Sequence, residues 1–263
     1  MLTVHILASG SEGNCLLVEG GRVRLLVDAG ISTRRITAAL GELGLSPADM
    51  SGVLLTHEHT DHTAGLATLT KRYQLPLYAS GGTARALCGR ICGAAEVLRV
   101  IPRKGTFFVG DVQVTVFPTS HDAAESVDYR FDLGGAALGV LTDTGCVTPE
   151  AEQALCGVGL LVLESNHDVE WLMSGPYPYY LKQRIAGAQG HLSNEAAGAF
   201  ARQLAQRGTR QFVLAHLSRE NNTPERAYQA AALALTGLDA AVTVAPRDRL
   251  SGPYRAEVCV CSE

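Results

Sequence analysis

The hexapeptide His57-Glu58-His59-Thr60-Asp61-His62 places three histidines and an aspartate within six residues. It directly follows the apolar stretch Gly52 to Thr56, which predicts a buried strand. The zinc-protease pattern H-E-x-x-H would need a histidine at position 61, where this chain has aspartate. A loop at a strand end can turn such side chains toward one or two adjacent cations. The hexapeptide therefore predicts a metal site, with a polar loop that binds no ion as the alternative.

Two ions need more ligands than one loop supplies, so further candidates are expected where other predicted strands end. Three polar side chains share that position: His121 after Val112–Phe117, Asp143 after Ala137–Leu141, and His216 after Gln211–Ala215. Taken singly, each is compatible with an ordinary polar role. Together with the hexapeptide, they complete the ligand set of a dinuclear site.

The composition is that of a folded globular protein, because 46% of the 263 residues are hydrophobic and 18% are charged. The net charge of -4 excludes a wholly basic protein that coats nucleic acid, although it is compatible with a local basic patch. Seven cysteines without C-x-x-C spacing favour a reducing cytoplasm over a disulfide framework or a zinc ribbon. No apolar stretch reaches about 18 residues, so no membrane span is predicted.

Strand and helix patterns alternate along the chain and predict an α/β fold. Strands are expected at 3–8, 15–19, 22–28, 52–56 and 76–79, and then at 97–101, 106–109, 112–117, 127–133, 137–141, 160–164, 211–215 and 242–245. Helices are expected at 32–43, 64–73, 83–92, 193–208 and 223–237. Two β-rich regions flanked by helices predict two facing sheets with helices outside. We expect them to form one domain over residues 1–263.

The chain order H-x-H-x-D-H, a later histidine, an aspartate and a final histidine resembles the metallo-β-lactamase superfamily. This resemblance implies an αββα four-layer sandwich of two facing mixed sheets, with two divalent transition-metal ions (Zn, Mn or Fe) at one edge. It also implies the ligands: His57, His59 and His121 for one ion, Asp61, His62 and His216 for the other, with Asp143 as the bridge. Asp28 resembles the buried acid that orients the histidine loop, with a plain turn aspartate as the alternative.

A second motif pair, Gly190-His191-Leu192-Ser193 and Ala215-His216, resembles the tRNA 3′-end-processing nucleases of the RNase Z type. The resemblance implies that His191 is a general acid poised by Glu164, and His191 as a structural hydrogen-bonding residue is the alternative. Longer stretches are similar to the YycJ/WalJ group of bacterial metal-dependent DNA exonucleases linked to repair: Ala8–Asn14, Glu164–Asp168, Gly190–Asn194 and His216–Asn222.

The segment from Asp143 to His216 is too short for a β-CASP insertion, and no long arm for gripping tRNA is evident. Nucleic acid would therefore be held by the body of the protein. Candidate substrate contacts are Ser11, Asn14, Asn166 and Arg219, together with Arg34, Arg35, Lys182 and Arg184. The aromatic-rich loop from Trp171 to Tyr180 could stack on bases or pack against a second copy.

These patterns favour a phosphodiesterase that cleaves DNA as an exonuclease, with a hydroxide activated by two cations about 3.5 to 4 Å apart. The predicted catalytic residues are His191, Glu164 and the ligand Asp61. The alternatives are a ribonuclease and a small-molecule hydrolase of lactams, lactones or thioesters, which would not require His191. A redox diiron protein is disfavoured because the chain has no room for a flavodoxin-like partner domain.

Overall fold

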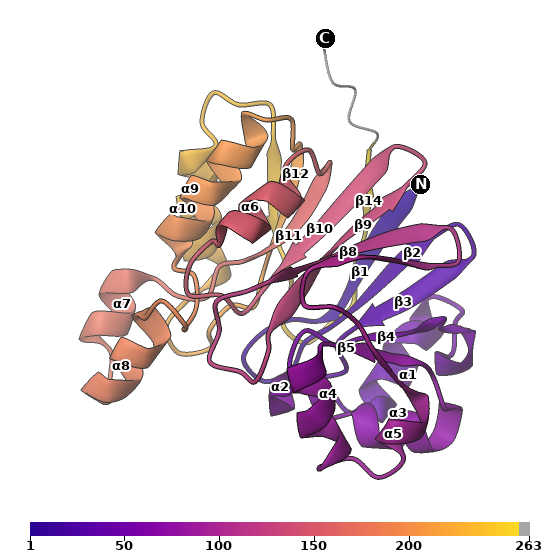
Figure 1. Ribbon diagram of the computed structural model, residues 1–263. Helices are drawn as coiled ribbons and strands as arrows, with labels where there is room; N and C mark the ends of the chain where they lie inside the picture. The colour runs from indigo at the N-terminus through magenta and orange to yellow at the C-terminus, as the bar shows by residue number, and fades with distance from the viewer. Residues whose placement is uncertain (258–263) are drawn as a thin grey trace.

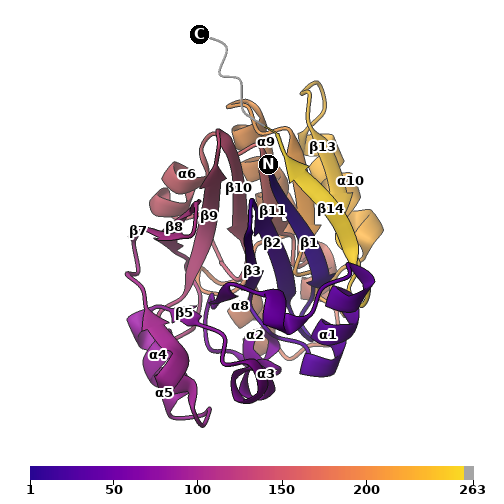
Figure 2. The ribbon, with the colours of Figure 1, turned by 90° about the vertical axis from the view of Figure 1, so that its right-hand side faces the viewer.

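Two seven-stranded sheets face one another in the computed structural model, which describes residues 1–257 (Figures 1 and 2). The strand order of the first sheet is β14 (Ser251–Ala256), β1 (Leu2–Ala8), β2 (Cys15–Gly20), β3 (Val23–Val27), β4 (Gly52–Leu54), β5 (Leu77–Ala79) and β6 (Leu98–Val100). Strands β14 to β3 are antiparallel to their neighbours, whereas β3 to β6 run parallel.

The strand order of the second sheet is β13 (Ala241–Val244), β12 (Gln211–Ala215), β11 (Leu160–Glu164), β10 (Ala136–Leu141), β9 (Val127–Leu133), β8 (Val112–Pro118) and β7 (Gly105–Val109). Its half from β10 to β13 is parallel and its half from β7 to β10 is antiparallel. Both sheets are therefore mixed, as the resemblance implied.

Helices cover the outer faces of the two sheets (Figure 1). The first sheet carries α1 (Thr33–Glu42), α2 (Thr60–Thr63), α3 (Leu66–Tyr73), α4 (Gly81–Cys88), α5 (Ala94–Val97) and the 3-10 turn η1 (Pro47–Asp49), and the second carries α6 (Pro149–Leu155), α9 (Asn194–Ala205) and α10 (Pro224–Ala234). The predicted αββα sandwich is confirmed. No helix within residues 1–257 has the length and apolarity that a membrane crossing requires.

Alternation along the strands builds the core between the sheets. Val112, Val114 and Val116 of β8 are buried and share one apolar cluster with Val4 and Ile6 of β1. The intervening side chains of β1 and its neighbours point the other way and form a second cluster with α1 and α3. Apolar side chains repeat about every 2 residues along a strand and about every 3.6 residues along a helix, and this spacing determines which faces are buried between the four layers.

Several elements were not predicted from the sequence, among them β14, α6 and two short helices. β14 is absent from the predicted strands because Gly252-Pro253 resembles a turn, yet it pairs with β1 as an edge strand, where proline is tolerated. α6 is also absent, although Thr148 caps it and Pro149 begins it. The expected aromatic loop contains two short helices, α7 (Val169–Ser174) and α8 (Tyr179–Ala186), which project together from the second sheet (Figure 1).

One buried hydrogen bond joins the two sheets next to the histidine loop. The hydroxyl of Tyr129, on β9, donates to the carbonyl of Leu55 at 2.6 Å. Leu55 follows β4 and lies two residues before His57. The second sheet therefore holds the backbone that leads into the hexapeptide.

Tyr129→Phe should lower the free energy of unfolding by about 1 to 3 kcal/mol, because the Leu55 carbonyl loses its buried donor. Urea unfolding of the metal-free protein measures the change. Tyr228→Phe is the matched control, since the Tyr228 side chain is 48% exposed and its hydroxyl can exchange with water. Equal stability of the two variants would contradict a role for this bond.

Candidate metal centre

The hexapeptide leaves β4 and begins α2, so its side chains gather at the end of the first sheet. His57 and His62 are fully buried, and His59 stands at the N-cap of α2. The Nε2 atom of His57 lies 3.0 Å from Nδ1 of His59, and the rings of His57 and His62 are 4.2 Å apart between centroids. The loop thus points its imidazoles at one another rather than at solvent.

The second sheet brings the other three predicted ligands to the same place. His121, Asp143 and His216 follow β8, β10 and β12. Nε2 of His62 lies 3.2 Å from Oδ2 of Asp143, and Nε2 of His121 and of His216 lie 3.7 Å and 3.6 Å from Oδ1. Asp143 is therefore the carboxylate on which histidines from both sheets converge.

The possible ligand atoms fall into groups whose members lie within 4.8 Å of one another. One group is His57, His59 and His121, and another is Asp61, His62 and His216. These are the residue sets that the resemblance assigns to the two ions. The structure thus brings all seven predicted ligands together, while ligation itself stays a prediction.

Two buried atoms of the cluster have no hydrogen-bond partner among the described residues: Oδ2 of Asp143 and Nε2 of His216. Buried polar atoms in native proteins are usually satisfied. Imidazole nitrogens and carboxylate oxygens are suitable ligands for zinc, manganese and iron. The cluster therefore fits divalent cations.

Burial and mutual contact determine the charges in the cluster. Burial lowers the pKa of His57 well below its usual value, which favours the neutral ring that a metal requires. Burial alone would also lower the pKa of His216, but the carboxylate of Asp143 and those of Asp61 and Glu164 raise it to about 10. Protonated histidines thus balance the buried carboxylates, so cation binding would release protons.

Asp28 supports the hexapeptide from β3. Its carboxylate accepts hydrogen bonds from the backbone N–H and the hydroxyl of Thr56, each at 2.9 Å, and its Oδ2 lies 2.7 Å from Nδ1 of His62. The ring of His62 is therefore oriented with Nε2 toward Asp61 and Asp143. These contacts are compatible with the predicted role of Asp28 as an orienting acid, which stays a prediction.

Backbone strain is concentrated at the same place. Asp28, Asp143 and His216 have φ values of 61°, 49° and 55°, which non-glycine residues rarely adopt. Within residues 1–257, the other non-glycine residue with a positive φ is Gln74, which ends helix α3. Strain of this kind persists where surrounding contacts fix the backbone, and it is frequent at functional sites.

Glu164 holds two histidines with one carboxylate. It is fully buried, and its Oε1 lies 2.7 Å from Nδ1 of His191 and 2.9 Å from Nδ1 of His216. Its Oε2 accepts from the backbone N–H groups of Thr144 and Leu192. Burial would raise the pKa of Glu164, but His191 and His216 lower it to about 2. Glu164 is therefore an anion that fixes both rings.

A cavity of about 190 Å³ opens beside the cluster. His59, Asp61, His121, Asp143 and His191 line it on one side. Its other wall is helix α8, through Leu181, Arg184 and Ile185. Arg184 forms an ion pair of 2.5 Å with Asp122, which also lines the cavity.

Four of the eight predicted substrate contacts, namely Ser11, Asn14, Asn166 and Arg219, do not share one environment. Asn14 is buried with Nδ2 3.2 Å from Nε2 of His62, and Asn166 is buried and donates to the carbonyl of His216. Ser11 and Arg219 are exposed and are not among the cavity-lining residues. Arg219 pairs with Glu12 at 2.6 Å.

The sequence reasoning missed two contributors to the site. Ser9 accepts a hydrogen bond from the backbone N–H of His216 at 2.8 Å, across 207 positions of sequence. Asp122 faces the cavity together with Arg184, which lies 62 positions away. The position of Asp122 directly after His121 was a usable signal for the second contact, whereas no local pattern indicates the first.

Comparisons with known proteins agree with this geometry. The family model described as "Beta-lactamase superfamily domain" matches residues 23–217. The chain is 41% identical to Exodeoxyribonuclease YycJ of Bacillus anthracis over 86% of each chain. It is 39% identical to Exodeoxyribonuclease WalJ of Streptococcus pneumoniae serotype 2 (strain D39) over 91% of this chain and 90% of that one.

A solved structure agrees at the level of the fold. The metallo-β-lactamase fold protein YhfI from Bacillus subtilis superposes with a TM-score of 0.72, at 18% identity, over 95% of this chain and 98% of that one. The chain therefore belongs to the metallo-β-lactamase superfamily, within the group of its YycJ and WalJ relatives. It is a metal-dependent hydrolase, and its fold implies divalent metal ions.

Asp28→Asn should weaken metal binding by about 10- to 100-fold, because asparagine cannot accept all three hydrogen bonds that orient Thr56 and His62. Zinc titration against a chromophoric chelator measures the affinity. Asp239→Asn, at an aspartate whose side chain is 97% exposed, is the control. Unchanged affinity in Asp28→Asn would make Asp28 a plain turn residue.

Proposed function

We propose that this protein is a phosphodiesterase that removes nucleotides from the end of DNA with the help of two divalent transition-metal ions. The observation that carries the proposal is the Glu164–His191 pair, in which the buried Glu164 holds a His191 that lines the cavity next to the seven-residue cluster. Lactam or thioester hydrolysis would not require this pair. The names of the YycJ and WalJ relatives support DNA as the substrate and an exonuclease activity.

His57, His59 and His121 would hold one ion, Asp61, His62 and His216 the other, and Asp143 would contact both. When bound, divalent cations lower the pKa of water and stabilise negative charge on phosphate oxygens. The ligand set accepts zinc, manganese and iron alike. Asp28 and Glu164 would hold the rings of His62 and His216 through their Nδ1 atoms, which leaves Nε2 of each ring toward the cluster.

His191 would protonate the leaving oxygen. Its Nδ1 contacts Glu164 at 2.7 Å, which leaves Nε2 for the substrate. Burial opposes a charge on His191, but the carboxylate of Glu164 outweighs burial and raises its pKa above the usual value. The raised pKa favours the protonated ring, the state that a general acid requires.

The same proposal covers the organisation and location of the chain. One domain over residues 1–263, without a β-CASP insertion, would carry the activity. Free thiols at Cys15, Cys88, Cys92, Cys146 and Cys156 fit the reducing conditions of the cytoplasm. A role in DNA repair follows from the similarity to the YycJ/WalJ group.

Incubation of manganese-loaded protein with end-labelled duplex DNA, single-stranded DNA and RNA tests the proposal. We expect stepwise shortening of DNA from one end, faster than any cleavage of RNA. Preferred cleavage of RNA would make the protein a ribonuclease. Turnover of lactams, lactones or thioesters without cleavage of nucleic acid would replace the nuclease with a small-molecule hydrolase.

His191→Ala should retain its metal ions yet lose about 10²- to 10⁴-fold in hydrolysis rate, the range for removal of a general acid. The wild-type rate should fall as the pH rises through the pKa of His191, and the pH–rate profile of the variant should lack this fall.

His216→Ala should lose metal together with activity. Metal content by mass spectrometry separates the two, and loss of an ion from His191→Ala would show that His191 is a ligand.

A further inference from the structure

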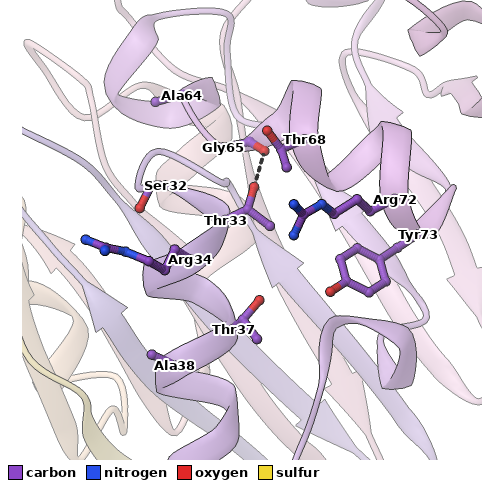
Figure 3. A pocket seen from close by; sticks show the side chains of 10 residues that line it. All are labelled: Ser32, Thr33, Arg34, Thr37, Ala38, Ala64, Gly65, Thr68, Arg72 and Tyr73. Atoms are coloured by element: carbon purple, nitrogen blue, oxygen red, sulfur yellow. Dashed lines mark hydrogen bonds between the residues drawn. The ribbon is translucent and has the colours of Figure 1, made fainter.

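A cavity of about 560 Å³ lies between helices α1 and α3, outside the metal centre (Figure 3). We call it the α1–α3 pocket. Arg34 and Thr37 line it from α1, and Thr68, Arg72 and Tyr73 line it from α3. In Figure 3 the guanidinium of Arg72 points from α3 toward α1, beside the ring of Tyr73, whereas Arg34 extends outward at the rim.

The lining has the chemistry of an anion site. Its residues include two arginines and five hydroxyl-bearing side chains (Ser32, Thr33, Thr37, Thr68 and Tyr73) but no carboxylate. Within residues 1–257, the guanidinium group of neither Arg34 nor Arg72 takes part in a hydrogen bond or an ion pair. Arg22 and Arg255 are likewise unpaired among these residues, so the pocket is distinguished by two free guanidiniums that line one cavity without a carboxylate. In a protein of net charge -4 this lining makes a local basic surface.

The pocket adjoins the metal centre through helix α2. Asp61 lines the cavity at the metal centre, and Ala64, three residues later, lines the α1–α3 pocket. Residues three apart on a helical turn are neighbours on one face. The backbone of Ala29, next to Asp28, joins the two regions because it bonds to the carbonyl of His62 and to the N–H of Gly65. A strand that leaves the metal centre over α2 would thus reach the pocket within a few nucleotides.

We infer that the α1–α3 pocket binds a backbone phosphate of the single DNA strand whose scissile phosphate lies at the metal centre. This inference rests on the proposed nuclease function and adds the path of the substrate strand. Arg34 and Arg72 would each neutralise phosphate charge, and the ring of Tyr73 would offer a surface on which a base can stack. The two arginines on opposite helices suit a chain that passes between them.

The salt dependence of DNA binding tests the inference. Arg34→Gln/Arg72→Gln should make the negative slope of log K against log salt concentration shallower by about 1.4, where K is the association constant for DNA. Each lost phosphate contact of a single strand accounts for about 0.7 of that change. Fluorescence anisotropy with the metal-loaded protein and a nuclease-resistant phosphorothioate 12-mer measures the slope. The matched control is Arg22→Gln/Arg255→Gln, which removes the same charge at the opposite end of the first sheet. Its slope should remain that of the wild type.

The length of the substrate separates a strand path from a site for a small anion. The ratio of variant to wild-type KM should rise from a dinucleotide to a 12-mer, reaching roughly tenfold near physiological salt. An equal effect on both substrates, or competition by mononucleotide alone, would replace the strand path with a nucleotide site. The inference is wrong if the wild type cleaves DNA and the double variant has the same salt slope and the same KM as the wild type. The proposed nuclease function would still hold in that case. If the wild type neither binds nor cleaves DNA, the proposed function fails first.

Discussion

The buried carboxylate of Asp143 is the interaction on which the rest of the site depends. Asp143 follows β10 of the second sheet. Its carboxylate oxygens lie within 3.7 Å of imidazole nitrogens of histidines from both sheets. A buried charge without partners would cost several kcal/mol, so the sheets must meet in the register that supplies these histidines. The cluster can therefore assemble only if the two sheets face one another in this register.

Neighbouring groups keep this concentration of charge tolerable. Asp128 lies behind the cluster and accepts from the backbone N–H of Thr142 at 2.7 Å. Burial raises the pKa of Asp128 well above its usual value, and the nearby carboxylates of Asp28 and Asp143 reinforce the shift. Burial thus disfavours a further negative charge beside the buried carboxylates of Asp28, Asp143 and Glu164. Carboxyl groups of one type can differ in pKa because their environments differ.

The sequence was sufficient for the layers and for the convergence of the ligands. Alternation at Val112, Val114 and Val116 predicted which face of β8 is buried, and the position of Asp143 and His216 after apolar strands placed both at a sheet edge. It was insufficient for contacts between distant segments. The pairing of β14 with β1, the ion pair of Arg219 with Glu12 and the contact of Ser9 with His216 each depend on tertiary packing, which local propensity does not encode.

The strained residues explain why the site forms at this edge. Asp28, Asp143 and His216 all follow strands, and their positive φ values turn the chain sharply where each strand ends. A regular continuation would carry each side chain along the sheet instead of back toward the cluster. The cost of about 1 to 3 kcal/mol for each such residue must be offset by the contacts that the turn makes possible. Asp28 gains three hydrogen bonds, Asp143 gains its histidines, and His216 gains Glu164. All of these contacts lie between residues of the chain itself, so the packing that offsets the strained turns also directs the predicted ligand side chains toward one another.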